Sequence, residues 1–440
     1  MKKKFTIKTN HLEIISCVLL LLWTISPIIE YAFKNFYRKY YTLYFSNITY
    51  LIGSLGIIVY IIYFIKFKKK EKINIKKFIP EILLILLLVI SVISSILSEN
   101  QHLSIFGEPY RKEGLIVYFM YIGIMLMASI IKDNKYIKYI CQSIIISCLI
   151  ITITPLFRNN FTYYKFTNIF HNTNHYGYYL MINVMLSLFM FINSNKLIKK
   201  ITYIIIYIFF LYLLIRNNTF GSYLAVFATI IFLLVYSLIT KYNRLKTVLI
   251  FILLMIVSFA VSNLDIKIGE RIHLESTKGM LLNNLFVLKR DIKGIIDNDG
   301  AIMYSAGSYR LTLWKEAWKY TLKHPTFGGG MECLRNYYIS DLKMFYTDFN
   351  DRPHNSIIQV AAFIGIPGAI IYFSFIMYIA ISNLIIMKKD DTNIMIYASA
   401  MCYFLSSLLG NSMYYTSPYF MILLGLLIGF NRSKTRLTKS

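Results

Sequence analysis

The chain has 440 residues, of which 57% are hydrophobic and 15% charged, and its mean hydropathy is +0.56. A soluble domain of this size does not need so much apolar surface, so the composition excludes a soluble protein and predicts an integral membrane protein. The formal net charge of +26 could indicate a nucleic-acid partner. However, Lys and Arg gather in short segments between apolar runs, so the charge is interpreted as a topology signal and no nucleic-acid partner is expected.

The apolar runs predict an all-α membrane protein with about twelve transmembrane helices and a layout like that of GT-C glycosyltransferases. A helical span needs ~20 predominantly apolar residues. Continuous rather than alternating hydrophobicity argues against β-barrel spans. The predicted spans are 12–32, 44–65, 79–98, 115–131, 137–157, 175–193, 199–215, 219–239, 247–263, 355–386, 394–411 and 418–430.

The distribution of Lys and Arg orients these spans. If the N-terminus lies in the cytoplasm, the short cytoplasmic segments carry most of the cations, including the run from Lys66 to Lys77. The positive-inside rule therefore predicts that both termini are cytoplasmic. The basic start resembles a signal peptide but lacks a small-residue cleavage site, so an uncleaved first helix is expected. Residues 1–440 are predicted to form a single polytopic domain, with a long extracytoplasmic loop at 264–354 before the tenth span.

Polar residues suited to chemistry collect on the extracytoplasmic side. The loop before the fourth span reads "SENQHLSIFGEPYRKEGLIVYF" and places Arg111, Lys112 and Glu113 beside Gly114, while the seventh span ends in Arg216. Arg111 and Lys112 are equally explained as cations that extend from the bilayer to the interface. The cytoplasmic segments are short and rich in Lys, so any chemistry is expected outside, without access to nucleotide sugars or ATP.

The sequence predicts no metal site. His171 and His175 lie four residues apart before the sixth span, but no third ligand or carboxylate stands nearby. They are better explained as polar loop residues. Cys333 is the single cysteine in the long loop, so neither a disulfide framework nor a cysteine metal site follows, and no cofactor is predicted.

The long loop contains a predicted amphipathic helix at residues 308–323. Its apolar residues recur at helical spacing: Leu311, Trp314, Trp318 and Leu322. Such a stripe with a basic edge is typical of a helix that lies on a membrane surface. The stripe does not explain Arg310, which stands in the first turn. An Arg near helix N-terminal amides suits a diphosphate.

The stretch "NDRPHNSIIQVAAFIGIPGAIIYFSF" places Arg352 and His354 at the mouth of a long apolar helix. One interpretation is an interfacial anchor. The alternative is a catalytic group held above the lipid, because an imidazole titrates near neutral pH and can accept a proton from a sugar hydroxyl. In the same helix, Gly365 and Gly368 would permit close packing, and Pro367 would introduce a kink.

Four motifs resemble one family. "HNSIIQVAAFIGIPGA" resembles the His-Asn, nine residues, Gly-x-x-Gly motif of bacterial O-antigen ligases and their relatives, which include O-antigen polymerases and protein O-oligosaccharyltransferases. "YRLTLWKEAWKYTLKHPTFGGGM" is similar to the family's Arg-x-x-x-Trp helix followed by His-Pro-x-x-Gly-x-Gly. "FGEPYRKEGLIVYF" resembles its Gly…Arg-x-x-Gly loop, and "FHNTNHYGYYL" its Asn-x-Asn segment. The matches run in the family's order from about residue 104 to 425.

This resemblance implies a metal-independent membrane glycosyltransferase of the GT-C type in the bacterial cytoplasmic membrane. Its donor would be a polyprenyl-diphosphate-linked glycan, its acceptor a hydroxyl of a glycan, lipid or protein at the external face, and membrane lipids would surround it. By resemblance, His354 is the base that activates the acceptor, and Arg310 and Arg111 contact the diphosphate. In-line attack on the opposite face from the leaving group predicts inversion at the anomeric carbon.

Further residues are assigned to substrate binding. They are Lys112, Arg216, Arg352 and Asn355. The family often has Ser-Arg-Gly at the start of the eighth span, whereas this chain has Thr219, Phe220 and Gly221, so Arg216 is the expected substitute for the missing Arg.

Two classes of function remain open. Within the enzyme class, a polymerase, a ligase to a lipid or polymer and a protein O-oligosaccharyltransferase differ only in the acceptor, and the Ile-, Lys- and Asn-rich composition slightly favours a polymerase. The other class is a non-catalytic transporter or flippase of lipid-linked glycans. Such a protein predicts ionisable residues at mid-bilayer and internal repeats, which the sequence does not show, so the enzyme is favoured.

Overall fold

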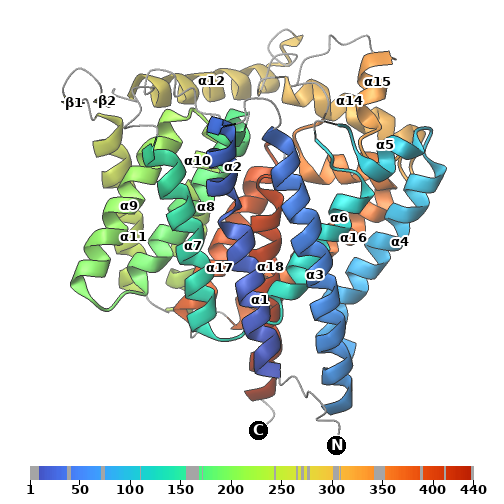
Figure 1. Ribbon diagram of the computed structural model, residues 1–440. Helices are drawn as coiled ribbons and strands as arrows, with labels where there is room; N and C mark the ends of the chain where they lie inside the picture. Colours follow the sequence, from blue (N-terminus) through green and yellow to red (C-terminus); the bar gives the residue numbers. More distant parts are fainter. Residues whose placement is uncertain are drawn as a thin grey trace, which may run out of the picture.

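Helices make up most of the computed structural model. The described residues are 9–36, 41–70, 75–109, 111–154, 168–170, 172–241, 244–263, 266–268, 272–274, 278–300, 307, 309–340, 352–386, 390–410 and 413–437. Long helices run side by side between two ends of a bundle, and both chain termini lie at the lower end in Figure 1. Further elements cover the upper end, which we call the loop end: the end that carries α5, α12, α14 and α15.

The bundle and its short connecting helices follow the apolar runs of the sequence. They are α1 (Thr9–Thr24), α2 (Ser26–Phe36), α3 (Tyr41–Lys70), η1 (Ile75–Phe78), α4 (Ile79–Leu97), α6 (Leu115–Ala128), α7 (Asn134–Ile153), η4 (Asn168–Phe170), α8 (Thr173–Ile192), α9 (Leu197–Arg216), α10 (Phe220–Thr240), α11 (Arg244–Ser262), α16 (Ser356–Ile386), α17 (Asp391–Ser407) and α18 (Ser417–Leu437). The elements at the loop end are α5 (Gln101–Phe106), β1 (Ile266–Ile268), β2 (Ile272–Leu274), α12 (Lys278–Ile296), α14 (Arg310–Lys323) and α15 (Leu334–Ser340).

The protein is an α-helical, multi-pass membrane protein. Eight described helical segments are long and apolar enough to cross a bilayer: Asn10–Ala32, Ser46–Lys66, Ile79–Leu97, Asn134–Ile153, Thr173–Ile192, Leu197–Arg216, Phe220–Thr240 and Ser356–Ile385. These segments coincide with eight of the predicted spans. The other predicted spans correspond to α6, α11, α17 and α18, whose apolar parts are shorter or less hydrophobic. The total of twelve spans stays a prediction.

Helix α8 lies at the centre of the bundle, and every side chain from His175 to Met190 is buried. Helix α4 lies at the periphery, where Ile82, Ile85 and Val89 are exposed. An apolar face without protein cover is expected on a helix that borders lipid, whereas an all-round buried helix belongs in the interior. The central position of α8 places its first turn beneath the loop end.

Helix α16 is kinked near its start, as the sequence predicted. Ile364 and Gly365 depart from helical geometry, and Gly365 has a φ of +81°. The break lies just before Pro367, since proline disfavours helical geometry in the preceding turn. The kink exposes backbone groups of α16 toward the loop end.

The long loop is more structured than the sequence predicted. The expected helix at 308–323 begins at Arg310, because Tyr309 adopts a left-handed conformation with a φ of +64°. Leu313, Ala317 and Tyr320 form its buried face, whereas Trp318 on the predicted stripe is 45% exposed. Helix α12 and the antiparallel β1–β2 pair were not predicted. In Figure 1, α12 and α14 lie across the ends of the bundle helices.

Candidate functional site

The candidate site lies at the loop end and is built by three segments. We call them the first loop (107–114, between α5 and α6), the glycine loop (324–333, between α14 and α15) and the histidine segment (352–355, before α16). All three carry motifs that the sequence singled out. The contacts among them explain why these motifs occur together.

The glycine loop docks into the kink of α16 through backbone hydrogen bonds. The amides of Gly329 and Gly330 donate to the carbonyls of Ala362 and Phe363 at 3.0 and 3.1 Å. In return, the amide of Ile366 donates to the carbonyl of Pro325 at 2.8 Å. Without this loop, the kink would leave buried backbone groups unpaired, which is unfavourable.

Glycines are required on both sides of this contact. A Cβ at Gly328, whose φ is +70°, would lie 2.4 Å from the backbone of Phe363. A Cβ at Gly365 would lie 2.3 Å from the carbonyl oxygen of Thr326. The His-Pro-x-x-Gly-x-Gly and Gly-x-x-Gly motifs therefore meet in one backbone-to-backbone contact, which only residues without a side chain permit.

His354 is held at the entrance to α16. It is 6% exposed and has a φ of +53°, which is uncommon for a residue with a Cβ. Asn355 caps α16, since its Oδ1 accepts from the amides of Ile357 and Ile358 at 3.0 and 3.1 Å. The Asn355 amide also donates to the carbonyl of Leu408 at 3.1 Å. The cap therefore fixes the start of α16, and with it His354, to the end of α17.

Arg352 lies two residues before His354 and is fully buried. Its guanidinium forms ion pairs with Glu113 of the first loop and Glu332 of the glycine loop. The hydroxyl of Tyr121 on α6 donates to the other oxygen of Glu113 at 2.8 Å. The two carboxylates thus engage the charge of Arg352, and this cluster joins all three segments of the site.

Arg310 differs from Arg352 because no carboxylate lies within ion-pair distance of it among the described residues. It opens α14 and donates to the carbonyl of Gly307 at 2.7 Å, while Asp291 of α12 accepts from the amide of Gly307 at 2.8 Å. Burial lowers the pKa of Arg310, and the nearby phenol of Tyr178 acts in the opposite direction. Within the described part of the chain, Arg310 is therefore a half-buried cation that no carboxylate neutralises.

A second donor on α14 is also unsatisfied. Within the described part of the chain, neither Nε of Arg310 nor Nε1 of Trp314 has a hydrogen-bond acceptor, and both atoms are buried. The two residues are four apart in a helix and share one side of it. Unpaired buried donors are unfavourable, and they are a reason to look for a ligand that carries acceptors.

The other predicted cations also lie at the loop end. Arg111 is buried, with Nη1 at 4.0 Å from the sulfur of Met413, and Arg216 at the end of α9 donates to the Tyr212 hydroxyl at 2.8 Å. Lys112 is partly buried, and desolvation lowers its pKa.

Arg310 and His354 approach the same end of α17. The Arg310 charge interacts electrostatically with Tyr178, whose hydroxyl donates to the carbonyl of Ser406 at 2.8 Å. His354 is followed by Asn355, which binds the carbonyl of Leu408. The expectation that these groups share one cavity with Arg111 stays a prediction.

The predicted histidine pair is only partly described. His171 lies outside the described residues. His175 is buried on α8, with its ring centroid 6.2 Å from that of Tyr415. Within the described segments, no group of three or more His, Cys, Asp or Glu residues is arranged to hold a metal ion.

Sequence analysis gave no role to Glu113 or Glu332. Glu113 stands beside Arg111 and Lys112, where an i,i+1 neighbour is the obvious partner, and its actual partner lies 239 residues away. Glu332 follows the glycine run, and the basic residue nearest to it in the sequence, Arg335, pairs with Glu108. Their signal is compositional, since the chain has only 21 acidic residues and a buried one needs a counter-charge.

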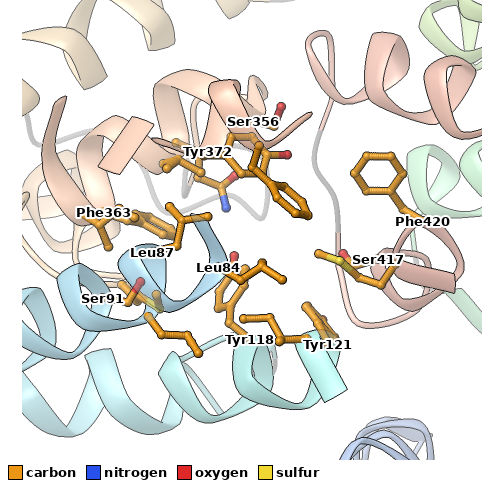
Figure 2. A pocket seen from close by; sticks show the side chains of 18 of the residues that line it. Leu84, Leu87, Ser91, Tyr118, Tyr121, Ser356, Phe363, Tyr372, Ser417 and Phe420 are labelled. Atoms are coloured by element: carbon orange, nitrogen blue, oxygen red, sulfur yellow. The ribbon is translucent and has the colours of Figure 1, made fainter. Parts of the chain in front are cut away.

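An apolar cavity lies among α4, α6, α16 and α18 (Figure 2). Leu84 and Leu87 of α4, Phe363 of α16 and Phe420 of α18 contribute to its wall. Its lining also reaches the candidate site. Met331 precedes Glu332, Tyr121 binds Glu113, and Ser356 pairs with the hydroxyl of Ser407 at 3.0 Å.

These features define a class: a multi-pass helical membrane protein with buried cations and a histidine gathered at one end of its bundle. Residues 205–373 match the family model described as O-antigen ligase. This match supports the predicted resemblance to the O-antigen ligase and polymerase superfamily, whose members are glycosyltransferase-like enzymes, over somewhat less than half of the chain. The matched residues include Arg216, Arg310 and His354, whereas the first loop precedes them. No curated protein matches the chain.

Proposed function

We propose that this protein is a glycosyltransferase that moves or polymerises a polyprenyl-diphosphate-linked glycan onto an acceptor hydroxyl at the external face of the bacterial cytoplasmic membrane. The observation that carries the proposal is Arg310, a half-buried guanidinium whose Nε is buried and which has no carboxylate partner among the described residues. A diphosphate would supply the missing anion. The O-antigen ligase match over residues 205–373 supports this choice of chemistry.

Arg310 and Trp314 are assigned to the diphosphate. A guanidinium can bind two phosphate oxygens at once, and the indole N–H adds a neutral donor one turn further along α14. When the bond to the sugar breaks, negative charge grows on the leaving diphosphate, and cations already in place stabilise it. Arg111 and Lys112 of the first loop, and Arg216 as the substitute for the family's missing Arg, are assigned to the same anion.

His354 is assigned to the acceptor. Its imidazole takes the proton of the acceptor hydroxyl while the hydroxyl oxygen forms a bond to the anomeric carbon. On the opposite face, the bond from that carbon to the diphosphate oxygen breaks, and the polyprenyl diphosphate leaves with the electron pair. In-line displacement inverts the anomeric configuration. No resident metal or cofactor enters this scheme, because the protein's own cations stabilise the leaving group.

Arg352 and Asn355 receive different roles from those suggested by the sequence. The two carboxylates of Glu113 and Glu332 already engage the Arg352 charge, and Asn355 caps α16 and binds Leu408. Neither side chain is assigned to a phosphate. The cavity among α4, α6, α16 and α18 is proposed to take part of a lipid chain, since apolar side chains dominate its wall and it reaches Ser356 beside the histidine segment.

The enzyme is preferred over a transporter because of where charge is buried. The buried Arg111 and Arg216 and the half-buried Arg310 lie at the loop end rather than along the middle of the helices. A polymerase is preferred by a small margin over a ligase or a protein O-oligosaccharyltransferase, which share the donor and differ in the acceptor.

The test uses purified protein in lipid nanodiscs, a polyprenyl-diphosphate oligosaccharide and a panel of glycan, lipid and peptide acceptors. The proposal predicts stoichiometric release of polyprenyl diphosphate and formation of a glycosidic bond with inverted configuration, measured by mass spectrometry and NMR. Movement of intact donor across the bilayer without bond cleavage would favour a flippase and contradict the proposal.

A further inference from the structure

We infer that Glu332 and Glu113 are positioning residues for His354, acting through Arg352. This inference rests on the proposed role of His354 and extends it to two carboxylates to which the sequence motifs assign no role. Glu113, Glu332 and Arg352 are all buried, and the guanidinium binds one carboxylate with each terminal nitrogen. They tie the first loop and the glycine loop to the histidine segment.

The backbone between Arg352 and His354 has little conformational freedom. Only Pro353 separates them, and the proline ring fixes its own φ near −65°. A shift of the Arg352 backbone is therefore passed to His354 rather than absorbed between them. On the other side, Asn355 fixes the start of α16 to the carbonyl of Leu408. His354 is thus clamped between two anchors, of which the ionic one is supplied by the two glutamates.

The backbone around this cluster is strained in each of the three segments. Lys112, Glu332 and His354 adopt φ values of +50°, +63° and +53°. A left-handed conformation costs a residue with a Cβ roughly 1–2 kcal/mol, and it persists only where surrounding contacts impose it. The ion pairs supply such contacts. Glu332 is itself paired, Glu113 is paired and follows Lys112, and Arg352 is paired and lies two residues before His354.

A purely stabilising role explains this arrangement less well. A buried ion pair seldom stabilises a fold more than apolar residues of the same volume, because both charges lose their hydration. Two carboxylates facing one guanidinium add a further buried charge. The ion pairs have a functional role if they fix the position of the neighbouring His354.

The experiment compares Glu332→Gln, Glu113→Gln and Glu332→Asp with a matched control, Glu316→Gln. Glu316 lies on α14 and pairs with Lys319, outside the cluster. A misplacement of a catalytic group by about 1 Å can lower a rate by about 100-fold. We expect kcat to fall by roughly 10- to 100-fold in both Gln variants, with the donor KM unchanged, partial recovery in Glu332→Asp and no change in Glu316→Gln. Wild-type kcat in both Gln variants would overturn the inference.

A second readout does not depend on activity. Hydrogen exchange, followed by mass spectrometry, should become faster in the peptide that spans residues 352–358 in Glu332→Gln and Glu113→Gln, and stay at the wild-type rate in Glu316→Gln. If the wild-type protein does not transfer glycan, the proposed function is wrong. The exchange rates at residues 352–358 still show whether the two glutamates hold the histidine segment in place. Unchanged exchange at 352–358 in both folded Gln variants would refute the clamp even if the enzyme were active. Glu113→Gln, in a different loop, covers the case in which Glu332→Gln does not fold.

Discussion

Replacement of Arg310 should separate function from stability. In Arg310→Met the chain loses one hydrogen bond to the carbonyl of Gly307 and a half-buried cation that no described carboxylate neutralises. Loss of the hydrogen bond destabilises the fold, whereas loss of the unneutralised cation stabilises it. The free energy of unfolding should therefore change by no more than about 1 kcal/mol. Arg352→Met is the matched comparison. It leaves Glu113 and Glu332 buried without their counter-charge and should cost about 3–5 kcal/mol.

Activity should respond in a different order. Arg310→Lys keeps the charge but loses one of two phosphate hydrogen bonds, each worth about 1.5–3 kcal/mol when charged groups take part, so kcat/KM should fall roughly 10- to 150-fold. Arg310→Met should fall further. The assay measures transfer rate and thermal unfolding on the same nanodisc samples. Full activity in Arg310→Lys, or a loss of stability in Arg310→Met equal to that in Arg352→Met, would refute the assignment of Arg310 to the diphosphate.

Three further predictions follow from the same contacts. Trp314→Phe keeps the aromatic bulk but removes the buried N–H, so the donor KM should rise by about tenfold; an unchanged donor KM would remove Trp314 from the site. Gly365→Ala should lower both thermal stability and activity, because the new Cβ would meet the Thr326 carbonyl; Gly279→Ala, where no atom lies within 4 Å, is the control, and equal behaviour of the two variants would contradict the docked kink. Transfer should continue after prolonged treatment with EDTA, and a loss that magnesium restores would show that a metal takes part.

The sequence predicted the parts of this molecule that local patterns encode. Apolar runs located the membrane helices, and the Arg310 helix was placed within two residues of its start. The backbone contact between the glycine loop and α16 was not predicted, although both motifs were recognised, because neither contains information about its partner. The ion pairs of Arg352 escaped prediction for the same reason: Glu113 is 239 residues away, and only the packed bundle brings it close.

The sequence assigned both Arg310 and Arg352 to the substrate and did not predict that their partners differ. Both are arginines beside recognised motifs, and a pattern of letters cannot distinguish a cation held between carboxylates from one buried without them. The structure makes that distinction at Glu113 and Glu332. The predicted apolar stripe of α14 also differs from the buried face of that helix. Trp318, which belongs to the stripe, is on the exposed side, whereas Leu313 and Ala317 face the protein.

The most direct test of the account is the rate of glycan transfer by His354→Ala relative to wild type. Both proteins are purified in nanodiscs and supplied with the same polyprenyl-diphosphate oligosaccharide and acceptor, and His102→Ala on α5, where the imidazole is exposed, serves as a control for the loss of an imidazole outside the site. General-base assistance contributes about 10²- to 10⁴-fold, so His354→Ala should retain no more than about 1% of the wild-type rate while its unfolding temperature stays unchanged. Transfer by His354→Ala at the wild-type rate would contradict the assignment of His354 as the base.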